Sequence, residues 1–141
     1  MQTKLHAILA TALLIIPLAG LLVGCGGGKK QADVSAQVQA LKGTDKDAKL
    51  TACTELGALK EAAAAAVPDL IECLKDTDPE IRRLAAYALG EMGPAAIKAV
   101  PALKPLLQDG DRQVMMQAIN SIRSIDPKAI DSKTSIPNVQ N

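Results

Sequence analysis

The chain has 141 residues, with 16 Lys and Arg, 15 Asp and Glu and a single histidine. Residues 1–24 have the pattern of a leader, and the rest of the chain forms one small domain with equal numbers of basic and acidic residues and no histidine. The neutral charge predicts no nucleic-acid binding, and the lack of imidazole excludes most familiar catalytic and zinc-binding sites. Tyr87 is the only aromatic residue, so stacking platforms for bases, sugars or flat cofactors cannot form.

The leader has the pattern of an export signal, because Lys4 precedes an apolar run over residues 7–23. The sequence Leu22-Val23-Gly24-Cys25 resembles the lipobox of bacterial lipoproteins, in which a small residue before the cysteine admits the signal peptidase. The resemblance implies that residues 1–24 are a signal peptide and that Cys25 becomes the first residue. It also implies a diacylglycerol thioether on its sulfur and a fatty acyl chain such as palmitate on its amino group, which together give stable anchoring.

An uncleaved membrane helix is the alternative, since the segment 7–24 is just long enough to span a bilayer. The lipoprotein interpretation is favoured by the hydrophilic, glycine-rich sequence that follows, so we predict a lipidated cysteine and flexible tether over residues 25–33. Gly26 rather than Asp follows Cys25, which in bacterial groups with a known sorting rule points to the outer membrane. We therefore expect a lipid-anchored protein of the bacterial cell envelope that faces the periplasm.

Beyond the tether, the sequence repeats itself at a 33-residue offset. Four sets of residues coincide at this offset: Val34, Val67 and Val100; Leu41, Leu74 and Leu107; Asp45, Asp78 and Asp111; Ala52, Ala85 and Ala118. Within each unit the apolar residues recur at steps of three and four, which predicts two antiparallel helices per unit. The predicted helices span residues 34–42, 46–60, 66–75, 79–92, 100–108 and 112–125, with Asp78 as an N-cap before Pro79.

Residues 67–90, with the sequence VPDLIECLKDTDPEIRRLAAYALG, look like a HEAT-like repeat of the short type also found in phycobilisome lyases. The resemblance implies an all-α fold, a short right-handed α-solenoid of about three helical pairs over residues 34–129. We expect the polar residues 130–141 to form a disordered tail. In this family an aspartate in the turn and an arginine on the next helix hold neighbouring units together, and here they would be Asp76 and Arg82.

The first and third units depart from this pattern. The first has Gly43 and Lys49 at the corresponding positions, and the third keeps Asp109 but has Met115 in place of the arginine. We therefore expect the polar ladder between units to be weaker at both ends.

The resemblance also implies that the second helix of each pair lines a concave surface along which partners bind. Residues on the exposed face of the predicted fourth and sixth helices are the candidate partner-binding set: Glu80, Arg83, Tyr87, Glu91, Met116 and Asn120. Tyr87 has the character of an interface anchor, and the alternative is that it covers the seam between repeats. Because Met115 and Met116 are adjacent, both cannot be fully buried in one stripe.

Cys53 and Cys73 are the thiols of the repeat region, and their spacing does not indicate a metal site. Antiparallel helices that turn near residue 63 would place them side by side. They could then form a disulfide in an oxidising compartment, or they could be two small buried apolar residues.

Taken together, these features predict a membrane-anchored HEAT-like lipoprotein that serves as a scaffold for another protein, and not an enzyme. We expect no cofactor and no metal. A bilin-lyase-like or other small-ligand protein is the first alternative, and a structural envelope component without a defined partner is the second. A ligand protein should have a closed apolar pocket with converging polar groups, whereas a scaffold should have an open face of mixed polarity.

Overall fold

A computed structural model describes residues 27–130. Its elements, in chain order, are α1 (Gly27–Lys42), α2 (Lys46–Leu59), the 3₁₀ helix η1 (Lys60–Ala66), α3 (Val67–Cys73), α4 (Pro79–Glu91), η2 (Gly93–Ala99), α5 (Val100–Leu103), η3 (Lys104–Gln108) and α6 (Arg112–Ile125). The predicted signal peptide, Cys25 and residues 131–141 of the predicted tail lie outside the described residues.

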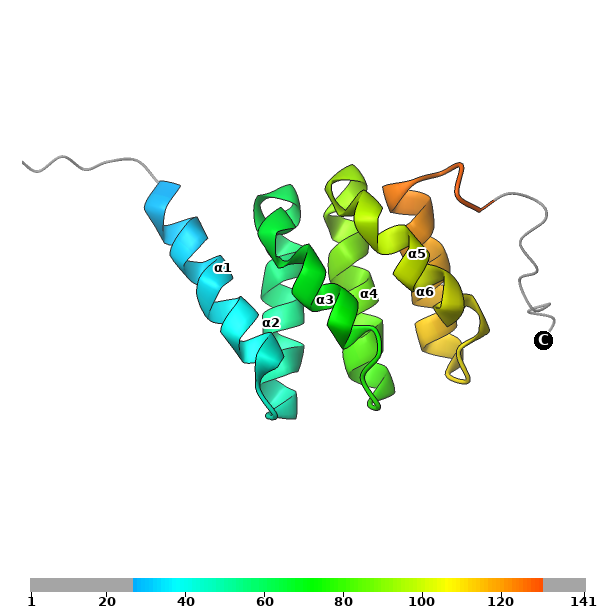
Figure 1. The fold of residues 1–141 in the computed structure, drawn as a ribbon, viewed down its shortest axis with the longest axis horizontal. Coiled ribbons are helices and arrows are strands. Elements are labelled where there is room, and N and C mark those ends of the chain that lie inside the picture. Colours follow the sequence, from blue (N-terminus) through cyan, green and yellow to red (C-terminus); the bar gives the residue numbers. More distant parts are fainter. Residues whose placement is uncertain (1–26, 131–141) are drawn as a thin grey trace, which may run out of the picture.

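The helices form three antiparallel pairs arranged side by side (Figure 1). The second helices, α2, α4 and α6, pack against one another in that order and form one layer, while α1, α3 and α5 form the other. The described part of the chain is thus the short all-α solenoid that the sequence predicts. Within it, no helix is both long enough and apolar enough to cross a bilayer.

This arrangement gives the array two distinct edges. The turn edge consists of the short connections within the pairs, at residues 43–45, 76–78 and 109–111. The η edge lies at the other end of the helices and contains η1, η2, the start of α1 and the end of α6 (Figure 1).

An aspartate begins each second helix at the turn edge. Asp45, Asp78 and Asp111 have extended backbone conformations, and their side chains accept hydrogen bonds from backbone N–H groups of the first helical turn. The N–H of Glu80 donates to Asp78 over 2.8 Å, and Pro79 fills the first helical position, where no N–H is needed. The same cap therefore fixes the start of α2, α4 and α6 at equivalent places in the repeat.

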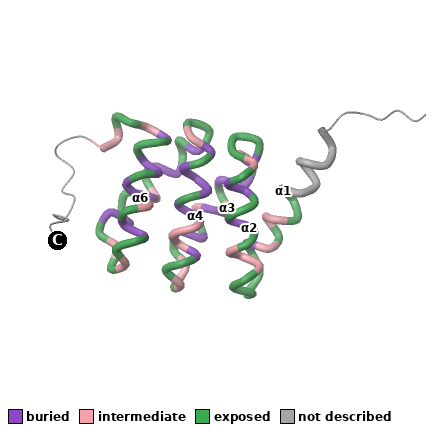
Figure 2. Tube along the Cα trace, turned by 180° about the vertical axis from the view of Figure 1, so that it is seen from behind, coloured by how far each residue is buried: buried purple, intermediate pink, exposed green. Residues whose placement is uncertain are grey.

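The core runs continuously between the two layers (Figure 2). Leu56, Leu89 and Ile122 occupy equivalent positions of the repeat on the three second helices, and all three are fully buried. No pair could bury these side chains alone, so each depends on stacking against its neighbour.

Glycine and serine allow the second helices to approach closely. A Cβ atom at Gly57 would lie 3.3 Å from Ala88 Cα, and one at Gly90 would lie 3.0 Å from Ser121 Cα. The buried Ser121 hydroxyl donates a 2.6 Å hydrogen bond to the carbonyl of Ala86, and Ser124 donates a 2.8 Å bond to the carbonyl of Gly90. Gly57 and Gly90 occupy equivalent positions of the repeat, so small residues set the distance between α2 and α4 and between α4 and α6 in the same way.

The structure differs from the predicted boundaries at two kinds of place. First, α1 begins at Gly27 rather than at residue 34, so the helix takes in residues 27–33, which we expected to be flexible tether. Lys, Gln and Ala in this segment are good helix formers, and extending an existing helix avoids the cost of nucleation. Second, 3₁₀ helices replace other structure that we expected. Residues 60–66 and 93–99 form such helices where we expected a loop and the first turn of an α-helix. The helix predicted over residues 100–108 is α-helical only over Val100–Leu103 and continues as 3₁₀ over Lys104–Gln108, because Pro105 has no N–H for the next α-helical hydrogen bond.

Candidate functional site

The candidate partner-binding residues lie on one side of α4 and α6. We call the surface formed by Glu80, Arg83, Tyr87, Glu91, Met116 and Asn120 the second-helix face. All of these side chains are exposed except that of Arg83, which is half-buried. Tyr87 and Met116 are 37% and 39% exposed, and they are two of the three large apolar or aromatic side chains that are exposed among residues 34–130.

Tyr87 also contacts the neighbouring helix. Its Cε1 atom would lie only 3.2 Å from a Cβ atom at Gly57, so the ring lies over the place where α2 and α4 approach most closely. A tyrosine in this position covers the seam and exposes more than a third of its surface at the same time. The two roles that the sequence left open for Tyr87 are therefore compatible.

A small hollow lies at the turn-edge end of the second-helix face. It has a volume of about 130 Å³ and is lined by Pro79, Glu80, Arg83, Asp111 and Gln113. The sequence identified Glu80 and Arg83 as site residues, whereas Asp111 appeared only as the repeat position equivalent to Asp45 and Asp78. Asp111 reaches the hollow because α6 packs beside α4, and the 33-residue offset places these two N-termini at the same height.

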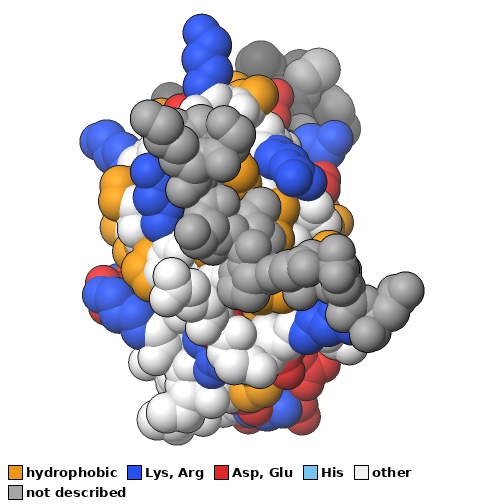
Figure 3. Space-filling view, turned by 90° about the vertical axis from the view of Figure 1, so that its right-hand side faces the viewer, with side chains coloured by type: hydrophobic (Ala, Val, Ile, Leu, Met, Phe, Trp, Pro, Cys, Tyr) orange, Lys and Arg blue, Asp and Glu red, His pale blue; other side chains and the backbone are white. Residues whose placement is uncertain are grey.

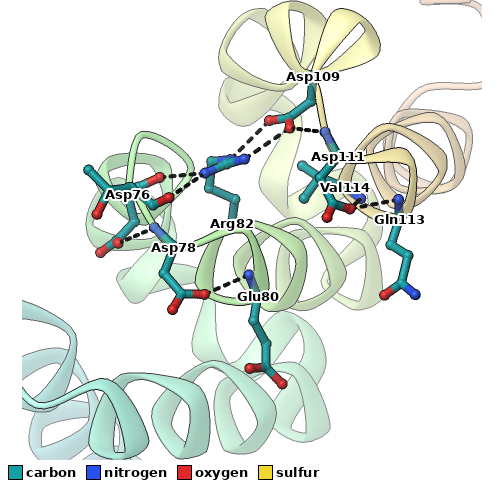
Figure 4. A network of polar contacts seen from close by, with 9 residues as sticks. Asp76, Asp78, Glu80, Arg82, Asp109, Asp111, Gln113 and Val114 are labelled. Atoms are coloured by element: carbon teal, nitrogen blue, oxygen red, sulfur yellow. Dashed lines mark hydrogen bonds and ion pairs between the residues drawn. The ribbon is translucent and has the colours of Figure 1, made fainter.

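Ion pairs and hydrogen bonds link each helical pair to the next along the turn edge. Lys49 donates a 2.8 Å hydrogen bond to Asp76 Oδ2. Arg82 donates two 2.9 Å bonds to the carboxylate of Asp109, as Figure 4 shows. The two members of each pair are separated by the same distance in sequence, so these are equivalent contacts one repeat apart. We call these two contacts the ladder.

The ladder shows which partners Asp76 and Arg82 take between neighbouring units. The Asp76 carboxylate binds Lys49 of the preceding pair, and Arg82 reaches Asp76 only through its backbone carbonyl, at 2.9 Å. An aligned sequence identifies equivalent positions but does not show which neighbour a side chain points to. Lys49 holds the arginine position of the first unit, where we expected a weaker ladder, and its ammonium group satisfies one carboxylate oxygen as a guanidinium does.

The charges of the ladder shift the pKa values of its members. The ammonium of Lys49 lowers the pKa of Asp76, and the guanidinium of Arg82 lowers the pKa of Asp109; a backbone N–H two residues further on adds to each effect. In return, the carboxylates raise the pKa values of Lys49 and Arg82. Each of these groups is therefore stabilised in its charged form when the protein is folded.

A second ionic contact supports the start of α4. Lys46 Nζ lies 2.8 Å from Asp78 Oδ2 and 3.2 Å from Glu80 Oε2, so it joins the beginnings of α2 and α4. Glu80 thus belongs both to the second-helix face and to this contact.

The two cysteines of the repeat region are buried and lie next to each other. Both are free thiols, and their side chains are within hydrogen-bonding reach across the first and second helical pairs. The Cys53 thiol lowers the pKa of Cys73 by hydrogen bonding to its thiolate, with help from the Lys49 charge, while that same contact and burial raise the pKa of Cys53. Cys73 also borders a hollow of about 260 Å³ with Lys49 and Asp76.

Among residues 27–130 no three His, Cys, Asp or Glu side chains come together in a group that could bind a metal ion. Apart from the exposed Glu91, the carboxylates described above serve as helix caps or as members of ion pairs, and the fold itself accounts for their positions.

Comparison with known protein families identifies the repeat. The profile of HEAT repeats matches residues 34–123, which include most of the three helical pairs described above. No curated protein matches the sequence.

Proposed function

Because the chain belongs to the HEAT-repeat family, we propose that it is a protein-interaction scaffold that lipid chains on Cys25 hold to a bacterial cell envelope membrane. HEAT repeats generally serve as scaffolds for protein interaction. The membrane attachment rests on the lipobox resemblance at residues 22–25, and the residue after the cysteine, Gly26, favours the outer membrane facing the periplasm.

The placement of Tyr87 and Met116 is the observation that carries the scaffold proposal. A helical array gains free energy by burying large apolar side chains, yet these two remain exposed on adjacent helices of one face. Charged and polar side chains surround them, including Arg83, Glu91 and Asn120. An aromatic anchor with a polar rim is the usual composition of a protein interface.

No enzymatic activity is part of the proposal. The bilin-lyase-like alternative rests on resemblance alone, and no observation favours it.

Site-specific photo-crosslinking in the native membrane tests the proposal. A photoreactive residue is placed at Met116 in the full chain, and the matched control carries it at Lys104, which is exposed on the first-helix layer. We expect one protein to be captured from position 116 and lost when Arg83→Glu is added. Equal capture from positions 104 and 116, unaffected by Arg83→Glu, would contradict the second-helix face as the binding surface.

A separate measurement tests the anchor. Intact-mass analysis of membrane-extracted protein should show a chain that begins at Cys25 and carries lipid. A chain that still begins at Met1, or normal processing of Cys25→Ala, would contradict this part of the proposal.

A further inference from the structure

We propose that the η edge of the array lies against the lipid surface, with Ile97 in contact with the bilayer. The inference rests on the proposed lipid anchor at Cys25 and adds an orientation to it. It leaves the second-helix face open to a protein partner along the sides of α4 and α6, except at Glu91, which ends α4 at the η edge.

The first observation is an exposed apolar surface at this edge. Ile97 of η2 is 49% exposed, the largest exposure among the large apolar side chains of residues 34–130. It borders a hollow of about 330 Å³, and the other residues that line this hollow are Ala64, Ala65, Val67, Pro68, Ile71, Ala95 and Lys98. No carboxylate lines it, so its only charged group is the Lys98 ammonium. An apolar surface with a lysine at its rim is suited to the boundary between acyl chains and phosphate headgroups.

The second observation is that the two edges differ in charge. Near the turn edge there are nine carboxylates and six cations, counted over residues 42–49, 69–82 and 109–112. At the η edge there are three carboxylates and four cations, counted over residues 60–66, 91–99 and 123–130. In Figure 3, which looks at the α6 end with the η edge upward, the largest group of acidic side chains lies at the bottom.

The cations of the two edges also differ in their partners. Five of the six turn-edge cations bind carboxylates of the protein, namely Lys42, Lys46, Lys49, Lys75 and Arg82, whereas Arg112 forms no ion pair with the described residues. Within the described part of the chain, the η-edge cations Lys60, Lys98, Arg123 and Lys128 form no ion pair. A membrane with anionic lipids would therefore attract the η edge and repel the turn edge.

The third observation is the position of the anchor. α1 begins at Gly27, runs antiparallel to α2 and contacts η1, so its first turn lies at the η edge (Figure 1). Cys25 precedes Gly27 by two residues, and two extended residues span only about 7 Å. Lipid chains on Cys25 would therefore hold the η edge, and not the turn edge, next to the headgroups.

Fluorescence quenching tests this orientation. The full chain is expressed with its leader, extracted from membranes and reconstituted into phosphatidylethanolamine and phosphatidylglycerol vesicles. An environment-sensitive thiol label is attached in the variant Ile97→Cys, and the matched control is Arg112→Cys at the turn edge. The chain without a new cysteine shows how much label reaches Cys53 and Cys73, which are buried.

We expect a blue shift and quenching by spin-labelled lipid at position 97, and neither at position 112. Intact mass is measured on the same samples. If the protein is lipidated but quenching is equal at both positions, or absent at position 97, the proposed membrane-facing edge is wrong and the scaffold proposal still stands. If Cys25 carries no lipid, both the proposed anchor and the proposed orientation are wrong.

Discussion

The guanidinium of Arg82 binds the carboxylate of Asp109 through two hydrogen bonds of 2.9 Å, and it does so across the boundary between the second and third helical pairs. Arg82 also donates to the backbone carbonyls of Asp76 and Thr77, which belong to the turn of its own pair. One side chain thus fixes the turns of two successive repeats relative to each other. Lys49 forms the simpler version of this contact with Asp76, one repeat earlier.

Removal of Arg82 should destabilise the array. The variant Arg82→Ala leaves the Asp109 carboxylate, whose side chain is only 8% exposed, without its charged partner. Hydrogen bonds to charged groups contribute about 1.5–3 kcal/mol each in net terms, so we expect a loss of about that size in the free energy of unfolding. Urea denaturation followed by circular dichroism measures it, and the control is Arg123→Ala, an exposed arginine of α6. Equal stability of the two variants would contradict the structural role of the ladder.

The ladder should make the stability depend on pH below neutrality. The pKa values of Asp76 and Asp109 lie below the ordinary value of 3.8 in the folded state, so the unfolded state binds protons first as the pH falls. Their contribution is complete above the unfolded pKa and disappears as the pH falls through the folded pKa. We expect the free energy of unfolding to drop between about pH 5 and pH 2. The variant Asp109→Asn should have a lower free energy of unfolding at neutral pH, and this free energy should decrease less over the same pH range. A decrease identical to that of the unmodified chain would exclude Asp109 as a contributor to the pH dependence.

The variant Gly90→Ala should be less stable despite the better helix propensity of alanine. Its new Cβ would lie 2.8 Å from Ser121 Oγ and 3.0 Å from Ser121 Cα, so backbone as well as side chain must move. Overpacking of this kind costs about 1–3 kcal/mol, which exceeds the gain of about 1 kcal/mol from replacing glycine in a helix. Thermal and urea melts measure the change. Gly110→Ala is the control, since no atom lies within 4 Å of its added Cβ; a stabilised Gly90→Ala variant would mean that α4 and α6 are further apart.

Truncation of Tyr87 separates its two roles. If the second-helix face binds a partner, Tyr87→Ala should weaken capture by about 2 kcal/mol or more, because large aromatic anchors dominate interface energies. A smaller loss of stability should accompany it, since the ring also lies over Gly57. Melting temperature and partner capture are measured on the same protein preparation. A large drop in melting temperature with unchanged capture would assign Tyr87 to the seam alone and move the search to exposed lysines outside the second-helix face, beginning with Lys75, Lys98 and Lys104.

The adjacent thiols of Cys53 and Cys73 should form a disulfide when the folded protein is incubated with a small-molecule disulfide. The Cys73 thiolate would attack this oxidant and release one thiol; Cys53 would then displace the second, with loss of two protons and two electrons from the protein. We expect a mass decrease of two hydrogens and a rise in stability of about 3 kcal/mol. Cys53→Ala should instead retain the mixed disulfide or stay unmodified. Two unmodified thiols in the native chain would favour the other interpretation, in which they are buried apolar residues.

The sequence predicted the repeat and most helix boundaries, because the features that define them are local. Asp78 with Pro79 marks the start of a helix without reference to any distant residue, and the start at Lys46 follows from Asp45 in the same way. Leu70 and Leu89 belong to the apolar residues that recur at steps of three and four in the sequence, and both are fully buried.

Contacts between repeats were harder to predict. The 33-residue offset showed that Lys49 and Arg82 are equivalent, but whether each reaches forward or back depends on the direction of a side chain in three dimensions. The hollow beside Arg83 was missed for the same reason, since Asp111 joins it only through the packing of α6 on α4. The start of α1 at Gly27 could not be read from a glycine-rich segment, because the packed part of the helix supports it.

The ends of the ladder have a consequence for self-association. Gly43 stands where the other turns carry Asp76 and Asp109, and Met115 stands where the other second helices carry Lys49 and Arg82. If a second copy stacked its first pair on the last pair of this one, Met115 would meet Gly43, and no charged contact would form. Head-to-tail stacking is the kind of contact that does not close and that grows into fibres. The two neutral positions therefore leave the array without the charge pairing that would favour polymerisation, although the repeat itself could be extended indefinitely.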